Sequence, residues 1–257
     1  MRLSFKALVR NAVADIMAQG YDKARHDWAW WILLALRRDY PPTKKAAERL
    51  TASYQRATQH GAIKKIAPHA GQQNIDRIKY KLAQELNDTI RAADDIINLH
   101  RQTAEADVQR RFIGWASSDP TIVDQRQVTS YIVKPMVDLT KKENNVITDQ
   151  KRKLERKVAT IIAKESGAIA GIWHSNFREP DYNYREVHKE HDLQGTVFLL
   201  PDNWATQNGW AKQTKHEQPG ELPNCKCYYR KYIYKLKDLP EHLLTAAGRE
   251  KVENERT

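Results

Sequence analysis

Hydrophobic residues in the first half of the chain recur at steps of three and four positions, with polar residues between them. This is the period of an amphipathic α-helix, and stop signals such as Gly20 and Pro41 separate its segments. The longest stripe begins at Ile75 and continues to Phe112, as expected for a member of an antiparallel helix bundle. The pattern therefore predicts four helices: residues 3–19, a segment that contains residues 28–36, residues 43–59, and residues 75–112.

The pattern becomes mixed in the middle of the chain. Residues 128–133 have the composition of a strand, although Pro135 is unsuited to a central one. Residues 141–145 are polar and are predicted to form a connection. The helical period returns over residues 148–177, where the inner side is formed by Leu154, Val158, Ile161, Ile162, Ile169 and Ile172. The chain is predicted to end in a further helix with Pro240 in its first turn.

Two short runs near the C-terminal end have the composition of β-strands. Residues 196–200 and 228–234 are β-branched, aromatic or apolar, and each follows a segment rich in turn residues. The predicted fold class is therefore α+β and mainly α. It consists of a helical domain of residues 1–145, followed by a compact α+β domain of residues 146–257 with a small antiparallel sheet.

Two pairs of metal-ligating residues precede these two runs. His188 and His191 stand before the first run, and Cys225 and Cys227, the only cysteines of the protein, stand before the second. Thiolates and imidazoles are the usual ligands of a structural zinc ion, which takes four. The four residues therefore predict a zinc site, with His216 as a spare ligand. The alternative is a pair of reduced thiols packed at the start of a strand, with exposed histidines.

The same stretch resembles the C-terminal region of phage head morphogenesis proteins, the Mu F-like minor head proteins. In that family an Arg-x-x-His element precedes a Gly and a short strand ending in Phe, and later Pro-Gly and Asn-Cys-x-Cys elements open another strand. The matching residues here are Arg185, His188, Gly195, Phe198, Pro219, Gly220, Asn224, Cys225 and Cys227. The family's Asp-Gly pair is stretched here to Asp192-Leu-Gln-Gly195, so either His188 or His191 can be the equivalent histidine.

The resemblance implies a structural role and no enzymatic activity. A protein of this family is expected in the virion, and in the host cytoplasm during assembly, with portal, capsid or scaffold proteins as partners in head assembly and DNA packaging. One alternative is a nuclease or toxin-like domain, in which Arg185 holds a phosphate and His188 or His191 carries the proton. Another is a zinc-stabilised DNA-binding module without catalytic activity.

The protein is strongly basic, with a formal net charge of +11 and an isoelectric point near 9.5. Such a protein is attracted to polyanions, so we expect it to bind DNA without sequence preference and more weakly as the salt concentration rises. The sequence lacks the glycine-rich loops that hold nucleotide phosphates.

The apolar run from Trp28 to Leu36 is far shorter than the ~20 residues that cross a bilayer. A helix that is apolar on all sides is usually interior, so the run is interpreted as a buried helix. Tryptophan is also enriched at the centres of protein interfaces. The alternative is therefore a surface for a partner protein, with Trp28, Trp30 and Trp31 as the contact residues.

Overall fold

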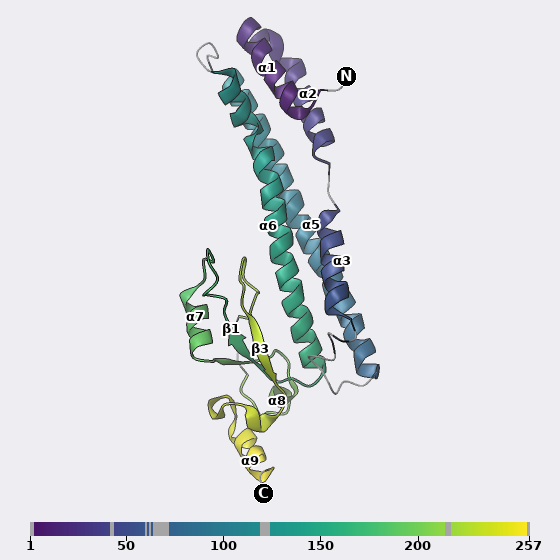
Figure 1. Ribbon diagram of the computed structural model, residues 1–257, viewed down its shortest axis with the longest axis vertical. Helices are drawn as coiled ribbons and strands as arrows, with labels where there is room; N and C mark the ends of the chain where they lie inside the picture. Colours follow the sequence, from purple (N-terminus) through teal and green to yellow (C-terminus); the bar gives the residue numbers. More distant parts are fainter. Residues whose placement is uncertain are drawn as a thin grey trace. The chain divides into compact units, whose positions relative to one another are not determined.

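In the computed structural model of the protein, the described residues form helices and one small antiparallel sheet, so the predicted α+β, mainly α, fold class is confirmed (Figure 1). The structure describes residues 3–41, 44–59, 61, 63, 72–118, 124–213 and 217–255. Their contacts define two units: Met1–Ala46 with Arg91–Ile147, and Ala47–Ile90 with Thr148–Thr257. The domain boundary after residue 145 stays a prediction, but the contacts group residues 47–90 with the C-terminal unit.

The first unit is built from helices that share one apolar core. It contains α1 (Phe5–Gln19), α2 (Tyr21–Asp39) and portions of α5 (Gln72–Ala116) and α6 (Gln125–Glu165). The hydroxyl of Ser4 accepts a hydrogen bond from the third residue of α1, and a glycine with a φ of 82° ends this helix. The predicted helices 3–19 and 75–112 therefore exist, and their apolar stripes supply much of the core: Phe5, Val9, Val13, Ile16, Val108 and Phe112.

Helix α6 contains two segments for which the sequence pattern predicts another type of structure. The strand predicted at 128–133 and the connection predicted at 141–145 are both wrong, because these residues are helical. Pro135 lies inside the helix and has no N–H for the carbonyl of Tyr131, four residues earlier. Arg111 on α5 compensates, since its Nη1 donates a hydrogen bond to this carbonyl at 2.8 Å. The proline is thus tolerated because another helix supplies the missing donor.

The tryptophan-rich helix α2 is amphipathic. Its buried side is formed by Ile32, Ala35 and Leu36, and Trp28 is half-buried with its indole N–H donating to an α1 carboxylate. Trp30 and Trp31, by contrast, are 57 % and 51 % exposed and contact each other edge to face. The interpretation of this run as a helix buried on all sides is therefore wrong. None of the described helices is both long and apolar enough to cross a membrane.

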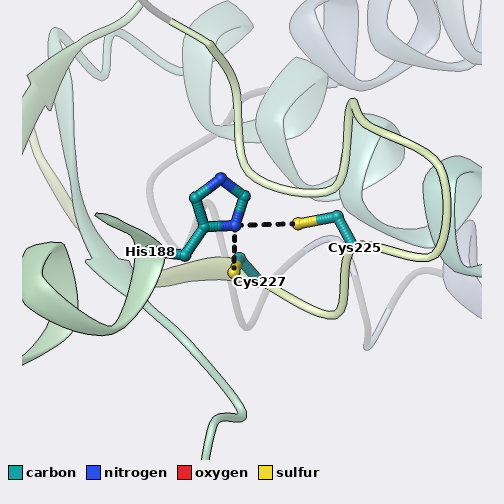
Figure 2. A group of neighbouring side chains, drawn as sticks. All are labelled: His188, Cys225 and Cys227. Carbon is teal, nitrogen blue, oxygen red and sulfur yellow. Dashed lines mark hydrogen bonds between the residues drawn. The ribbon is translucent and has the colours of Figure 1, made fainter. Parts of the chain in front are cut away.

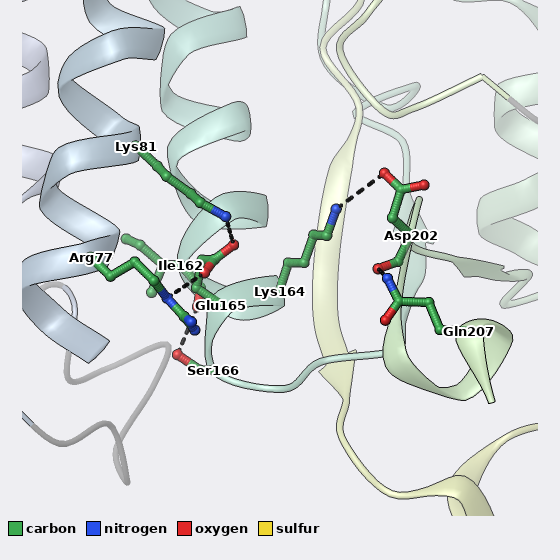
Figure 3. Close-up of polar contacts among 8 residues, drawn as sticks. All are labelled: Arg77, Lys81, Ile162, Lys164, Glu165, Ser166, Asp202 and Gln207. Atoms are coloured by element: carbon green, nitrogen blue, oxygen red, sulfur yellow. Dashed lines mark hydrogen bonds and ion pairs between the residues drawn. The ribbon is translucent and has the colours of Figure 1, made fainter. Parts of the chain in front are cut away.

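The second unit combines α3 (Lys45–Ala57) with the other portions of α5 and α6. Here Arg77 Nε contacts the Glu165 carboxylate at 2.9 Å (Figure 3). Lys157 Nζ contacts Glu85 at 2.6 Å. Later residues of α6 pair with earlier residues of α5, so the two helices run antiparallel. The hydroxyl of Ser53 on α3 donates to Glu155 of α6 at 2.7 Å.

A three-stranded sheet follows these helices. Strand β1 (Ala170–His174) lies between β2 (Val197–Leu199) and β3 (Tyr228–Ile233), and both pairings are antiparallel. The two predicted strands are therefore present, but the central strand was assigned to a helix. The helix predicted over 148–177 ends at Glu165, and Ile169 and Ile172 belong to the segment that enters and forms β1.

Short elements complete the second unit: α7 (Glu186–Leu193), α8 (Trp204–Gln207), the 3-10 turns η2 (Leu236–Asp238) and η3 (Glu241–Leu243), and α9 (Ala246–Asn254). The last helix begins later than predicted. Pro240 precedes η3, whereas α9 is capped by the hydroxyl of Thr245, which accepts from the N–H of Gly248 at 3.0 Å. The placement of Pro240 in the first turn of the final helix is therefore wrong.

Neighbouring residues of α5 provide a test of the first core. Phe112 is 2 % exposed, whereas Ile113 is 47 % exposed. Replacing Phe112 by alanine should lower the free energy of unfolding by about 3–5 kcal/mol, since it leaves a cavity. Ile113→Ala should change it by less than about 1 kcal/mol. Urea unfolding followed by circular dichroism measures both, and equal effects would contradict the assignment of this helix face.

Candidate metal centre

Three metal-ligating side chains meet in the second unit. The Nδ1 atom of His188 lies 3.6 Å from the sulfur of Cys225 and 3.4 Å from the sulfur of Cys227 (Figure 2). His188 comes from α7, and the two cysteines come from the loop that leads into β3. All three side chains are buried, with exposed fractions of 2 %, 1 % and 0 %. Among the described residues, they form the group of histidine, cysteine and carboxylate side chains that could hold a metal ion.

The spacing of these atoms matches a tetrahedral metal site. With a Zn–S bond of about 2.3 Å and a Zn–N bond of about 2.0–2.1 Å, tetrahedral angles place sulfur and nitrogen roughly 3.5 Å apart. The two measured distances fall on either side of this value. A neutral imidazole carries a hydrogen on only one of its nitrogens, so Nδ1 cannot donate a well-aligned hydrogen bond to both sulfurs at once. Its position between the two sulfurs is compatible with three atoms that bind one metal ion.

The cysteine loop, residues 219–227, is held by side chains from outside it. Asp149 of α6 accepts a hydrogen bond from the N–H of Asn224 at 2.8 Å. The Tyr182 hydroxyl accepts one from the N–H of Lys226, also at 2.8 Å. The Arg156 guanidinium donates to the carbonyls of Lys226 and Cys227. These bonds pair N–H and C=O groups of the loop that have no partner in a helix or strand. They thereby hold the backbone of the loop in the conformation that carries the two cysteines.

Two residues of the family motif have backbone roles in this loop. Asn224 has a φ of 58°, in the left-handed region that asparagine tolerates better than most residues. Gly220 has a φ of 81°, and a Cβ added to it would overlap the Cδ of Arg156. The N–H of Gly220 also points at the sulfur of Cys225. Glycine is therefore needed here for its conformation and for the close passage of Arg156.

The two thiols shift each other's pKa in opposite directions. The pKa of the Cys225 thiol is lowered to about 5, chiefly because Cys227 donates a hydrogen bond to it, with backbone N–H groups adding to the effect. The same hydrogen bond, together with burial, raises the pKa of Cys227. A metal ion would bind both residues as thiolates, so its binding would release the protons that they carry.

Of the two histidines predicted as ligands, the structure places only His188 at the thiols. His191 lies further along α7, where its ring packs against Trp173 and Phe198 with centroid distances of 5.4 and 4.9 Å. Burial, and secondarily the neighbouring His188, lower its pKa. The predicted four-ligand set is thus brought together only in part, and the spare candidate His216 lies outside the described residues.

The far side of the His188 ring faces a carboxylate. Glu217 Oε1 approaches Nε2 of His188 at 3.2 Å, although it lies off the direction of the ring N–H bond. The contact is therefore close but is not an aligned hydrogen bond. In many metal sites a carboxylate accepts a hydrogen bond from the far nitrogen of a ligating histidine, and Glu217 stands on that side of His188.

The remaining motif residues surround the same cluster. Arg185 begins α7, and its guanidinium reaches the carbonyl of Pro223 at 3.5 Å. Gly195, with a φ of 62°, turns the chain from α7 towards β2. Phe198 of β2 packs on Trp173, which in turn contacts the His188 ring at 5.1 Å. Pro219 opens the cysteine loop.

Several residues of the site were missed from the sequence. Trp173 is 1 % exposed and packs in one buried apolar cluster with both cysteines. The available signal was Gly167, a residue that commonly ends a helix, although the sequence pattern continues the helix past it. No sequence pattern predicts Asp149, Arg156 or Tyr182 as residues of the site. They bond to the backbone of the cysteine loop, and these contacts exist only in the folded chain.

No known protein family, curated protein or solved structure gives a significant match to the chain. The resemblance to head morphogenesis proteins therefore depends on the motif residues alone and stays a prediction.

A pair of glycine variants tests the packing of the cysteine loop. Gly209 and Gly220 both have positive φ, but only at Gly220 does a side chain occupy the space of a Cβ. Gly209→Ala should cost about 1–2 kcal/mol, from backbone conformation alone. Gly220→Ala should cost more and should also speed the reaction of the buried thiols with Ellman's reagent. Equal losses of stability with unchanged thiol reactivity would refute the role of Arg156 in this packing.

Proposed function

We propose that the protein is a structural minor head protein of a tailed bacteriophage, which acts in head assembly near the portal and the packaged DNA. We propose further that a zinc ion bound by His188, Cys225 and Cys227 holds its C-terminal unit together. One observation carries the proposal: the nine residues that resemble the head morphogenesis motif lie in or around one buried cluster. Residues spread over more than forty positions of the sequence are thus brought to one part of the second unit.

The ligand chemistry supports zinc. Two thiolates and one imidazole suit a borderline-soft divalent cation, whereas magnesium and calcium prefer oxygen ligands. In the described part of the chain between His188 and Cys225 the regular elements are short, such as β2 with three residues and α8 with four. Ordering such a segment costs conformational entropy, and it has little packing to compensate for that cost. A metal cross-link that closes the segment would reduce the cost.

Burial of the cluster supports a structural role over a catalytic one. A general acid or base must come within hydrogen-bond reach of its substrate. His188 is buried, with Nδ1 facing the two sulfurs and Nε2 facing Glu217. Arg185, the residue expected to hold a phosphate in a nuclease, reaches a backbone carbonyl of the cysteine loop. The nuclease alternative therefore has less support.

A partner surface is proposed on α2. Trp30, Trp31 and Leu34 are all exposed large apolar residues, and positions three and four apart share one side of a helix. Exposed tryptophans are costly in water and are enriched where proteins bind one another. We assign to this surface the contact with portal or capsid subunits. The net charge of +11 supports additional, sequence-independent contact with packaged DNA.

The zinc content tests the structural proposal. Protein purified without a histidine tag or added metal should contain about one equivalent of zinc. Cys225→Ser or Cys227→Ser should lose the metal and several kcal/mol of stability. His242→Ala, which changes an exposed histidine elsewhere in the unit, should keep both.

Zinc affinity should also fall as the pH is lowered, because protons compete for the thiolates and the imidazole. The measurement is metal analysis with thermal unfolding across a pH series. The zinc proposal would be contradicted by less than half an equivalent of zinc together with unchanged melting temperatures of both serine variants. Cys225 and Cys227 would then be two buried thiols without a metal.

The partner surface is tested with the full-length chain. The double variant Trp30→Ala, Trp31→Ala should fold normally, because both side chains are mostly exposed. It should bind the portal ring or capsid subunits of the same phage at least roughly tenfold more weakly, as expected for tryptophans at the centre of an interface. Tyr80→Ala, which removes an equally exposed aromatic residue from α5, serves as the control. Retained binding by the double variant would place the contact elsewhere.

A further inference from the structure

The candidate metal centre has fewer protein ligands than zinc requires. Zinc in a structural site is usually bound by four ligands, and the described residues bring three ligand atoms together. His191 packs against Trp173 and Phe198 instead. Glu217 approaches the opposite edge of the His188 ring, away from the sulfurs. One coordination position therefore needs a ligand that these side chains do not supply.

Ser175 lies beside the centre with its hydroxyl unused. It directly follows β1 and is 2 % exposed, and its Oγ has no aligned hydrogen-bond partner among the described residues. The antiparallel pairing of His174 with Tyr228, continued along the strands, places Ser175 opposite Cys227. A buried hydroxyl without a partner is unfavourable, so its position requires an explanation.

The surroundings contain a second unpartnered donor. The indole nitrogen of Trp173 is also buried without a hydrogen-bond partner, and its ring belongs to the cluster that contains both cysteines. A water molecule bound to the metal would offer an oxygen to a neighbouring hydroxyl. Waters at such positions commonly satisfy otherwise unpartnered buried groups.

We infer that Ser175 faces the fourth coordination position of the metal centre and that a water molecule held by Ser175 occupies this position. The inference rests on the proposed zinc site. It makes the centre one with three protein ligands and one exchangeable ligand, an arrangement that leaves room for a small neutral or anionic ligand at the metal. A fully closed site with four protein ligands would not.

X-ray absorption of the full-length zinc protein tests the ligand count directly. The expected spectrum has two sulfur ligands, a single imidazole and one additional oxygen. His191→Ala should leave both the spectrum and the zinc affinity unchanged. Two imidazole ligands, or loss of zinc in His191→Ala or His216→Ala, would show a fourth protein ligand and overturn the inference while leaving the zinc site itself intact. Absence of bound zinc or cobalt in the unaltered protein would instead overturn the zinc site, and this inference with it.

A gain-of-ligand variant tests the position of Ser175. In the cobalt-substituted protein, Ser175→Cys should add a third thiolate, so that the sulfur-to-cobalt charge-transfer band grows by about half and metal binding tightens. Ser166→Cys places an extra thiol elsewhere in the unit, since the Ser166 hydroxyl bonds to the carbonyl of Ile162 (Figure 3), and should leave the band unchanged. A folded Ser175→Cys protein with the band of the unaltered protein would refute the placement. If that variant fails to fold, the ligand count from X-ray absorption still decides.

Discussion

His188 Nδ1 lies within 3.6 Å of two sulfurs that follow it by 37 and 39 residues in the chain. Burying ionisable groups this close together is costly when they carry charge, unless an opposite charge or a proton neutralises them. A divalent cation bound to all three would provide that opposite charge. Helix α7, the cysteine loop and the start of β3 must all be placed to satisfy this one cluster.

The cysteine loop depends on its neighbours because it has no regular hydrogen-bonding pattern of its own. Arg156 has two effects here. Its guanidinium donates to two loop carbonyls. Burial lowers the pKa of the arginine, and the nearby Cys225 and Cys227 oppose that effect. A partly buried cation reduces the cost of burying a neighbouring thiolate. Helix α6 therefore contributes to the centre without supplying a metal ligand.

The periodic parts of the fold could be predicted from the sequence, and the errors have local causes. The stripes of α1 and α5 repeat over enough residues to be unambiguous. In α6, Pro135 was judged only as unsuited to a central strand. The helix tolerates it because Arg111, a residue distant in sequence, donates to the carbonyl that the proline leaves without a partner. Strand β1 was missed because its short apolar run follows a helix, where a few residues cannot distinguish the two periods.

The site could be predicted as a set of residue types but not as a geometry. His188 and His191 are three positions apart on α7, so their side chains project about 60° apart around the helix, and both can face the interior. Which of them reaches the thiols depends on how α7 lies on β1, and the sequence carries no local signal for that. The same holds for Ser175, an ordinary residue at a strand end whose importance comes from its place beside Cys227. The motif residues that resemble the head morphogenesis proteins are mostly glycine, proline, asparagine and arginine residues that shape the backbone around the cluster. The side chains of His188, Cys225 and Cys227 form the cluster itself, so the motif joins the residues that could bind a metal to those that shape the chain around them.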